Sequence, residues 1–224
     1  MRVEERFLAV LAVSVVAVGL LASYILPDAR GIAARAVATA APERLDPVAF
    51  QKKMRGLWTD HVQWTFATVD AFFHNQEAVQ AYLDRLLQNQ QEIGAAFAPF
   101  YGKEAGDRLA GLLTIHIQQA VPVLQAAQAG DEAALQRALA DWYANARDIA
   151  GFISDLNPNS WPQDDMRERW RVHIDQTTAY SLDLLNRNYA AAVTHFDEAL
   201  GHMMRLADVL ASGIIAQFPR RFAR

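Results

Sequence analysis

Residues 104–129, EAGDRLAGLLTIHIQQAVPVLQAAQA, carry the clearest amphipathic pattern in this chain. Apolar side chains recur there at the three- and four-residue spacing that places them along one face of an α-helix. The side chains expected on the inward face are Leu109, Leu112, Leu113, His116, Ala120, Val123 and Leu124. Gly130 follows directly and is expected to end the helix, because glycine adopts the left-handed C-terminal conformation without strain. The segment therefore predicts a long helix with His116 near its middle.

Five further segments on either side show the same helical pattern. They cover about residues 47–73, about 77–97, the stretch between the Asp131 cap and the Asn157-Pro158 break, about 160–188 and about 190–217. Asp46-Pro47 has the order of an N-cap followed by proline in the first turn, and Ser160-Trp161-Pro162 repeats it. The segment that begins near residue 77 is expected to end before Pro99.

These six segments are joined by short links, and no alternating pattern of β-branched residues interrupts them. The sequence therefore predicts an all-α fold. Helices this long suit an elongated up-and-down bundle, which we expect to have a four-helix core with two flanking helices.

The N-terminal region has a different character. The run from Phe7 to Leu26, FLAVLAVSVVAVGLLASYIL, contains no charged side chain, and a bilayer is crossed by about 20 apolar residues. Arg2 and Arg6 precede the run, which favours a cytoplasmic N-terminus and export of the remaining chain. We therefore expect a single-pass protein of the cell membrane, with its C-terminal domain periplasmic or on the outer surface.

Two interpretations of the apolar run are open. A cleaved secretory signal has a shorter apolar region, of about 7 to 15 residues, followed closely by a small-residue cleavage site. The possible cleavage site Ala36-Val37-Ala38 lies well beyond Leu26, so retention as an anchor is favoured. The predicted organisation is a transmembrane anchor over residues 1–27, a tether over 28–45 and an extracytoplasmic helical domain over 46–224.

Composition excludes several classes of function. The formal net charge of −4 provides no broad basic field, so nucleic acid is not an expected partner. The chain has no cysteine, which excludes disulfides, thiolate metal sites and covalent haem attachment through CxxCH. No nucleophile-elbow, P-loop or dinucleotide-binding motif is present. Arg220, Arg221 and Arg224 are the only basic cluster, either a solvated tail or a contact with lipid headgroups.

The residues best suited to chemistry are four mid-helix histidines, His61, His116, His173 and His202. They belong to four different predicted helices, and inward side chains from facing helices can converge into a metal or cofactor site. Imidazole groups suit copper, zinc, iron or haem iron. Trp64 lies one helical turn after His61, Met203 adjoins His202, and Asn89 is a polar residue on an apolar face. We include these three as cofactor-binding candidates.

A structural interpretation stands beside each of these residues. A single histidine on an apolar face is commonly a hydrogen-bonded core residue, and Asn89 could bond across the bundle and fix helix register. His74 and His195 are expected at the surface or at helix caps. The inward-leaning carboxylates would be Asp148, Asp197 and Asp208, for which salt bridges to Arg147, Arg167 or Arg205 are the preferred interpretation.

Six short motifs follow one another in an order that resembles a known family. They are LWxDHxxWT at 57–65, LLxNQxxIG at 86–94, YGxEAG at 101–106, LLxxHI at 112–117, WYxNAxDIA at 142–150 and ADxLxxGIIxQFP at 207–219. The family comprises small exported or membrane-tethered bacterial all-helical proteins, some of which carry a glycosyltransferase label. The resemblance implies export and a helical fold. The family has no established activity.

The resemblance also implies a set of polar pattern residues: His61, Asn89, His116, Asn145, Asp148, His173, His202 and Asp208. Relatives often place an acid before the last histidine, where this chain has Gly201, so an acidic metal ligand is not expected there. Our leading hypothesis is a membrane-anchored bundle that binds a transition metal (copper, iron or zinc) or non-covalent haem. The alternative is a non-catalytic ligand-binding or protein-interaction module whose buried polar residues are purely structural.

Overall fold

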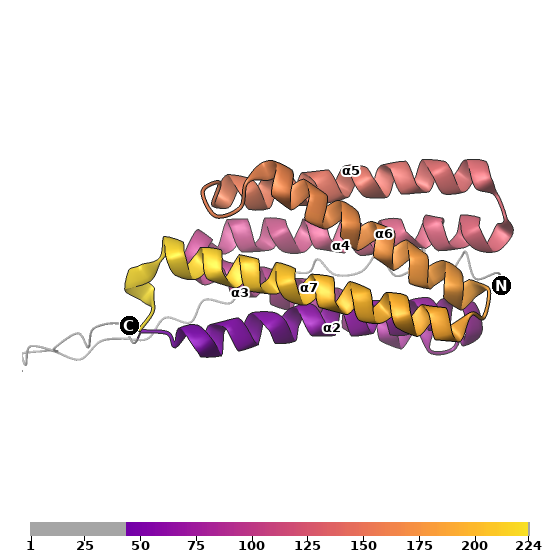
Figure 1. Cartoon of the computed structure of the whole chain (residues 1–224), viewed down its shortest axis with the longest axis horizontal. Coiled ribbons are helices and arrows are strands. Elements are labelled where there is room, and N and C mark those ends of the chain that lie inside the picture. Colours follow the sequence, from indigo (N-terminus) through magenta and orange to yellow (C-terminus); the bar gives the residue numbers. More distant parts are fainter. Residues whose placement is uncertain (1–43, 224) are drawn as a thin grey trace, which may run out of the picture. The chain divides into compact units, whose positions relative to one another are not determined.

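The computed structural model describes residues 44–223, and they form a helical bundle (Figure 1). Its helices are α2 (Pro47–His74), α3 (Val79–Tyr101), α4 (Lys103–Ala129), α5 (Glu132–Leu156), α6 (Gln163–Leu185) and α7 (Tyr189–Gln217), followed by the short 3₁₀ helix η2 (Pro219–Arg221). Within residues 44–223 the only β-type pairing is one isolated bridge. The all-α prediction is confirmed for this part of the chain, whereas the predicted anchor over 1–27 lies outside the described residues.

Three local sequence signals place helix ends as expected, whereas the cap expected at Ser160 is not formed, because α6 begins after Pro162 without a side-chain cap. The Asp46 carboxylate accepts a hydrogen bond from the backbone N–H of Val48 at 2.9 Å, directly before Pro47 begins α2. Asp131 caps α5 in the same way through the N–H of Ala134, also at 2.9 Å. Gly130 ends α4 with a φ of 67°, the left-handed conformation that favours glycine.

The predicted end of the second helix was wrong, because α3 continues through Pro99 to Tyr101. Proline lacks the N–H that would bond to the carbonyl four residues earlier, so it removes a single helical hydrogen bond. Pro99 lies within the last turn, where that loss affects little of the helix. The helix stops instead at Gly102, which has a φ of 90°.

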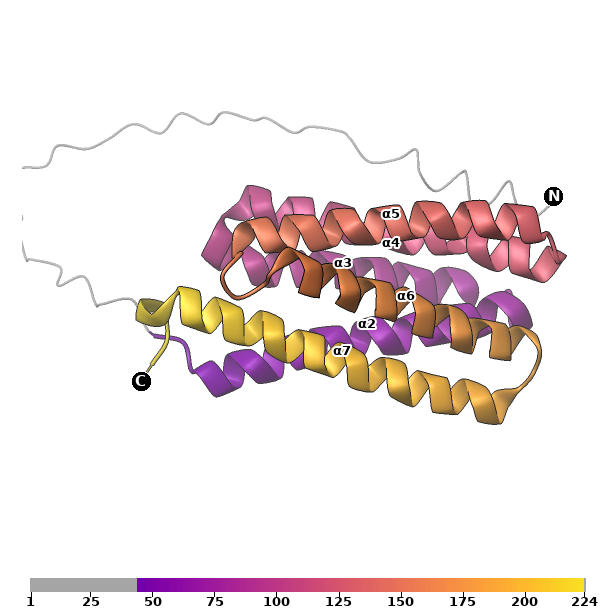
Figure 2. The same ribbon diagram turned by 45° about the horizontal axis from the view of Figure 1, so that its top comes forward.

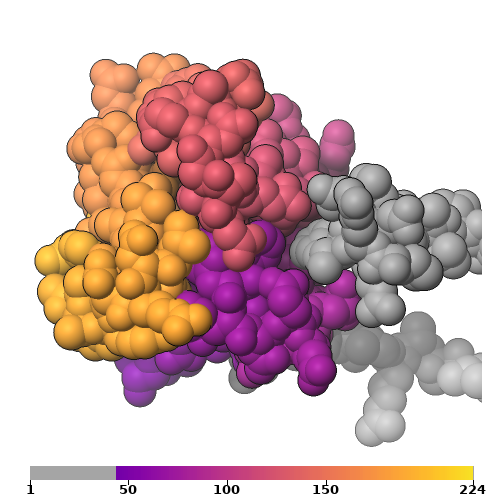
Figure 3. Space-filling view, turned by 90° about the vertical axis from the view of Figure 1, so that its right-hand side faces the viewer, coloured from indigo at the N-terminus to yellow at the C-terminus, as the bar shows by residue number. Residues whose placement is uncertain are grey.

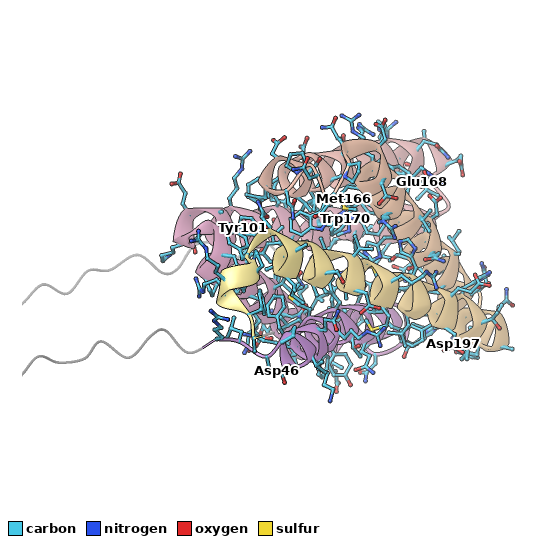
Figure 4. The ribbon with its side chains drawn as sticks, turned by 60° about the vertical axis from the view of Figure 1, so that its left-hand side comes forward. Asp46, Tyr101, Met166, Glu168, Trp170 and Asp197 are labelled. Atoms are coloured by element: carbon cyan, nitrogen blue, oxygen red, sulfur yellow. The ribbon has the colours of Figure 1, made fainter. Side chains whose placement is uncertain are left out.

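The helices run alternately up and down, and each packs against the next one along the chain (Figures 1 and 2). Helix α7 returns to α2 and closes the ring, while α6 also contacts α2 and α4. All six helices supply buried residues to one core, so the expected division into a four-helix core and two flanking helices is not observed. The reason is α6, whose fully buried Met166 and Trp170 fill the space inside the ring (Figure 4).

Both ends of the described chain are fastened together at one end of the bundle. Leu45 donates its N–H to the Arg221 carbonyl and accepts from the Ala223 N–H, each at 2.8 Å. Phe222, the partner of Leu45 in this bridge, is 2% exposed. Leu45 therefore belongs to the folded domain and not to the tether, because both of its backbone polar groups are paired there. The opposite end carries the α2–α3, α4–α5 and α6–α7 turns (Figure 3).

Two helices, α4 and α7, are long and apolar enough to cross a membrane by length and composition. About half of each is buried within the bundle, where Leu109 and Leu113 of α4 and Leu206 and Leu210 of α7 belong to the core. Their apolar character is therefore accounted for by packing against the other helices. Because the six helices cover one another's apolar faces, residues 44–223 contain a complete core of their own.

The contact between α3 and α4 depends on two glycines. A Cβ added to Gly94 would lie 2.4 Å from the Gly106 carbonyl oxygen and 2.8 Å from the Ala110 Cβ. A Cβ added to Gly106 would lie 2.7 Å from the Gly94 carbonyl oxygen. Real side chains do not approach so closely, so alanine at either position would push the two helices apart.

We therefore expect Gly94→Ala to lower the free energy of unfolding by about 1–3 kcal/mol, the usual cost of overpacking. Urea denaturation followed by circular dichroism measures this. Gly111→Ala is the matched control, because nothing lies within 4 Å of a Cβ added there. The control should gain about 0.5–1 kcal/mol from the lower entropy of the unfolded chain. Equal effects of the two substitutions would contradict the close approach of α3 and α4.

Candidate functional site

Three of the four predicted histidines meet in the middle of the bundle. His61 of α2, His116 of α4 and His173 of α6 are 1%, 1% and 4% exposed. The centroid of the His173 ring lies 5.5 Å from that of His61 and 5.6 Å from that of His116. Residues separated by more than fifty positions in the chain thus form one buried group, which we call the histidine core.

Helical spacing explains why these imidazoles point inward. Each follows a fully buried core residue by three positions: Trp58 before His61, Leu113 before His116 and Trp170 before His173. Side chains at i and i+3 share a face of the helix, so the imidazole lies one turn along the same inward stripe. Figure 4 shows Trp170 directed into the bundle and Glu168, two residues earlier, directed outward.

Three tryptophans surround the histidine core. The Trp58 ring lies 5.5 Å from His61, the Trp142 ring 5.2 Å from His116, and the Trp170 ring 5.6 Å from His116 and 5.7 Å from His173. Each of these tryptophans is at most 3% exposed. The surroundings of the imidazoles are therefore aromatic and shielded from water.

Many polar atoms in and around this core have no hydrogen-bond partner. They are both ring nitrogens of His61, Nε2 of His116, Nδ1 of His173, the indole Nε1 atoms of Trp58, Trp142 and Trp170, and Oε1 of Gln90. Buried polar groups in folded proteins are nearly always paired, and an unpaired one costs about 1–3 kcal/mol. Most of the polar atoms without a partner that surround the imidazoles are therefore concentrated in one part of the bundle.

His116 is the one member of the core whose orientation is fixed by a hydrogen bond. Its Nδ1 lies 2.9 Å from Oδ1 of Asn145, and Nδ2 of Asn145 donates to the Leu112 carbonyl at 3.2 Å. Because the Asn145 oxygen can only accept, His116 must carry its proton on Nδ1. Nε2 then presents a free lone pair, which is the arrangement found in metal-ligating histidines.

Two neighbouring amides have separate roles. Asn89 is fully buried and donates to the Leu57 carbonyl at 2.9 Å, so it connects α3 to α2. This geometry matches the register role weighed for Asn89 from the sequence. Gln90 was not singled out by sequence reasoning, although it stands in the LLxNQ motif. It donates to the Leu86 carbonyl at 2.7 Å. Its oxygen faces His61 closely enough to raise the pKa of that imidazole, although the contact does not have full hydrogen-bond geometry.

The remaining predicted site residues lie outside the histidine core. His202 is 7% exposed, and its Nε2 donates to the Arg169 carbonyl at 2.8 Å. Trp64 is only partly buried and packs on Tyr82, with ring centroids 5.9 Å apart. Met203 is fully buried among the apolar residues of the core. Met203 adjoins His202 in sequence, and adjacent helical residues face different sides of a helix. Trp64 follows His61 by one helical turn, but it lies nearer the surface, where it packs on Tyr82.

The two histidines assigned to the surface or to caps lie there, whereas the three carboxylates differ from the expectation. His74 contacts Asp70 and His195 contacts Asp183, at 2.9 Å and 2.6 Å between nitrogen and oxygen. Asp148 and Asp197 are exposed and do not lean inward. Asp208 forms an ion pair, but its partner is Arg55 of α2, at 2.6 Å, and not one of the three arginines proposed from the sequence.

Burial makes all three imidazoles neutral at physiological pH. Removal from water lowers the pKa of His61 to about 4, although hydrogen bonding by the Gln90 side chain acts in the opposite direction. The same desolvation, together with the nearby His61, lowers the pKa of His116 to about 3 despite the bond to Asn145. The pKa of His173 is held well below its usual value by burial and then by its histidine neighbours. Neutral imidazole is the form that binds metals.

The rings are near one another but do not converge on a point. Two imidazoles that share a zinc ion have centroids about 5.2 Å apart, given bonds of about 2.0–2.1 Å at tetrahedral angles. The observed separations of 5.5 Å and 5.6 Å are slightly larger, and the His116 and His173 rings are stacked at 26°. Stacked rings direct their nitrogens past each other. Accordingly, no group of three His, Asp or Glu residues within 44–223 is arranged to hold a metal ion as it stands.

Comparisons with known proteins add no identification, because no protein-family model, curated protein or solved structure significantly matches this chain. The family resemblance drawn from the six motifs therefore stays a prediction. What can be argued about function rests on the histidine core itself.

The lowered pKa values predict a strong acid sensitivity. In the unfolded chain a histidine takes up a proton below about pH 6.5, while the folded core keeps its imidazoles neutral. The unfolded state then binds more protons, so stability falls as pH falls below 6.5, by about 1.4 kcal/mol per pH unit for each histidine. This loss continues down to the folded-state pKa.

We expect His173→Leu to reduce that slope by one histidine, about 1.4 kcal/mol per pH unit. Urea denaturation between about pH 6.5 and pH 5 measures the slope for both proteins. An unchanged slope in the variant would show that His173 is not held neutral in the folded state.

Proposed function

We propose that the histidine core binds one first-row transition-metal ion through His61, His116 and His173. The observation that carries the proposal is the set of unpaired imidazole nitrogens, at least one on each histidine. A metal ion would satisfy those nitrogens, and three neutral imidazoles from three helices are a common ligand set for zinc, copper or iron.

The electrostatics of the site support metal binding, because the proposed ligands are already unprotonated. The pKa values of all three imidazoles are depressed by burial, so no proton has to be displaced from a ligand nitrogen at neutral pH. Asn145 holds His116 in the tautomer that leaves Nε2 free. His61 and His173 have unpaired ring nitrogens, so their rings can turn toward a shared ion without breaking a bond at those atoms.

A fourth donor is available from α3. Oε1 of Gln90 is buried, unpaired and beside His61, and a carboxamide oxygen can ligate a metal. We propose Gln90 as the fourth ligand, which completes a four-coordinate site. His202, which the sequence placed among the ligands, is left out because its Nε2 is already bonded to the Arg169 carbonyl.

A bare ion fits this site better than haem. The imidazole faces are already in contact with Trp142 and Trp170, at 5.2 Å and 5.6 Å between ring centroids. A porphyrin inserted between two histidines would have to displace these fully packed indoles. An ion requires only that the rings rotate, so of the two cofactors expected from the sequence we retain the transition metal.

Binding should be measurable on the full-length chain purified in detergent. After loading with Zn²⁺, Co²⁺ or Cu²⁺ and removal of free metal, we expect about one ion per chain and a raised melting temperature. At a free metal concentration of about 100 times Kd, the stabilisation is about 2.7 kcal/mol. His61→Gln and His173→Gln should each lose this metal-dependent rise, whereas His74→Gln, outside the core, should keep it. Absence of bound metal from the wild-type chain would refute the proposal.

A second candidate is a module whose buried polar residues serve packing alone. The Asn145–His116 bond and the close aromatic contacts favour it, because both hold helices together without a ligand. It requires that no metal raises the melting temperature of the wild-type chain, so the same titration separates the two functions.

We further propose that the domain is held at the outer face of the cell membrane by the apolar run Phe7–Leu26. The uncharged length of that run and the preceding Arg2 and Arg6 support this address. Bacterial reporter fusions test it: alkaline phosphatase joined after Arg224 should be active, and a cytoplasm-dependent fluorescent reporter at the same position should be dark. The reverse pattern would place the histidine core in the cytoplasm.

A further inference from the structure

The end of the bundle at which the described chain begins and finishes is basic on its α2–α7 side. Exposed basic side chains gather there from two distant segments: Arg44, Lys52, Lys53, Arg220 and Arg221. Across residues 44–55 and 209–223 the only acidic side chain is Asp46, whose carboxylate caps α2. We call these five residues the basic end. Asp208 of α7 lies just outside these segments and is paired with Arg55 of α2. Glu104 and Asp165, also near this end of the bundle, belong to α4 and α6.

Backbone pairing brings the two segments of the basic end together. The Leu45–Phe222 bridge joins the two segments, with both hydrogen bonds at 2.8 Å. Arg221 donates to the Pro99 carbonyl at 3.1 Å, and its guanidinium lies 5.6 Å from the centroid of the Phe100 ring. These contacts hold Arg221 against the bundle, so of the two interpretations of the basic cluster, a solvated tail does not describe this residue.

Apolar groups are interleaved with these charges. Val48 is 54% exposed and Leu45 is 39% exposed, so both present hydrocarbon to the surroundings. Beside them is a pocket of about 300 Å³, lined by Arg44, Ile215, Pro219, Arg220, Phe222 and Ala223. Arginine guanidinium groups over an apolar wall match a phosphate attached to a hydrocarbon chain.

From this surface we infer that the basic end rests on the headgroups of anionic phospholipid. The partner is chosen by charge complementarity and by the course of the chain, because residue 44 is connected through residues 27–43 to the apolar run Phe7–Leu26. The inference goes beyond the proposed metal site and uses none of its residues. It assigns the bundle an orientation, with its three helix–helix turns at residues 75–78, 130–131 and 186–188 farthest from the lipid.

The test uses the domain from Pro42 to Arg224, whose core is complete without the N-terminal run. Cosedimentation with vesicles compares pure phosphatidylcholine with a two-to-one mixture of phosphatidylcholine and phosphatidylglycerol. We expect binding to the mixture alone, weakened by added salt. Each basic side chain near an anionic surface contributes about fivefold, so Arg220→Gln/Arg221→Gln should weaken binding about 25-fold.

The control Arg137→Gln/Arg187→Gln removes the same charge from α5 and the α6–α7 turn, and it should bind like the parent domain. Circular dichroism of both variants verifies that they are folded. Equal loss in the two variants, or equal binding to both lipid compositions, would overturn the inference.

Orientation has an independent readout, because the chain contains no cysteine. Val48→Cys and Val193→Cys place a polarity-sensitive dye at two sites of nearly equal exposure, 54% and 56%. On anionic vesicles the dye at position 48 should shift to shorter wavelength, and the dye at position 193 should not. A shift at position 193 alone, or at both positions equally, would contradict the proposed orientation. Neither result depends on whether metal binds to the histidine core.

Discussion

The rest of this structure is organised around three neutral imidazoles buried among three indoles. Imidazole is polar, and in an ordinary core an apolar side chain of similar size would be more stable. Burial is tolerated here because the pKa values of His61, His116 and His173 fall far enough for each ring to stay uncharged. Neutral rings stack on aromatic neighbours without the large free-energy cost of a buried charge. Protonation of any of the three imidazoles would therefore act against the folded state.

Ordinary packing and hydrogen bonding between helices bring the histidines together. Gly94 and Gly106 allow α3 and α4 to touch through their backbones, and Asn89 ties α3 to the Leu57 carbonyl of α2. A register shift of one residue in α2 or α4 would rotate its histidine by about 100° and out of the core. The close contact of glycines and the buried amide thus fix the relative positions on which the site depends.

Much of this architecture could be predicted from local sequence signals. Asp46-Pro47, Asp131 and Gly130 determine helix ends through interactions within a few residues, and those ends were correctly placed. The closure of six helices into one ring could not be predicted, because it depends on which apolar faces meet in three dimensions. Pro99 was misjudged for a related reason: a proline in the last turn removes one bond, and the surrounding packing compensates.

For the site, too, the sequence predicted what depends on the local helix and not what depends on contacts with other helices. The inward direction of His61, His116 and His173 followed from periodicity, and all three are buried. The exclusion of His202 did not follow, since the Arg169 carbonyl that bonds to its Nε2 comes from a neighbouring helix. Trp64 was chosen over Trp142 by nearness in sequence, whereas packing brought Trp142 to 5.2 Å from His116. For Gln90 the only indication in the sequence was its position in the LLxNQ motif.

The distribution of satisfied and unsatisfied polar groups supports the proposal that the histidine core binds an ion. Asn89 and Asn145 have partners and already supply the connections between α2 and α3 and between α4 and α5. The unpaired nitrogens of His61 and His173 join nothing, so they contribute no register and cost free energy. Apolar residues would serve packing better at both positions. The polar atoms that lack a structural role are therefore the ones that a bound ion would use.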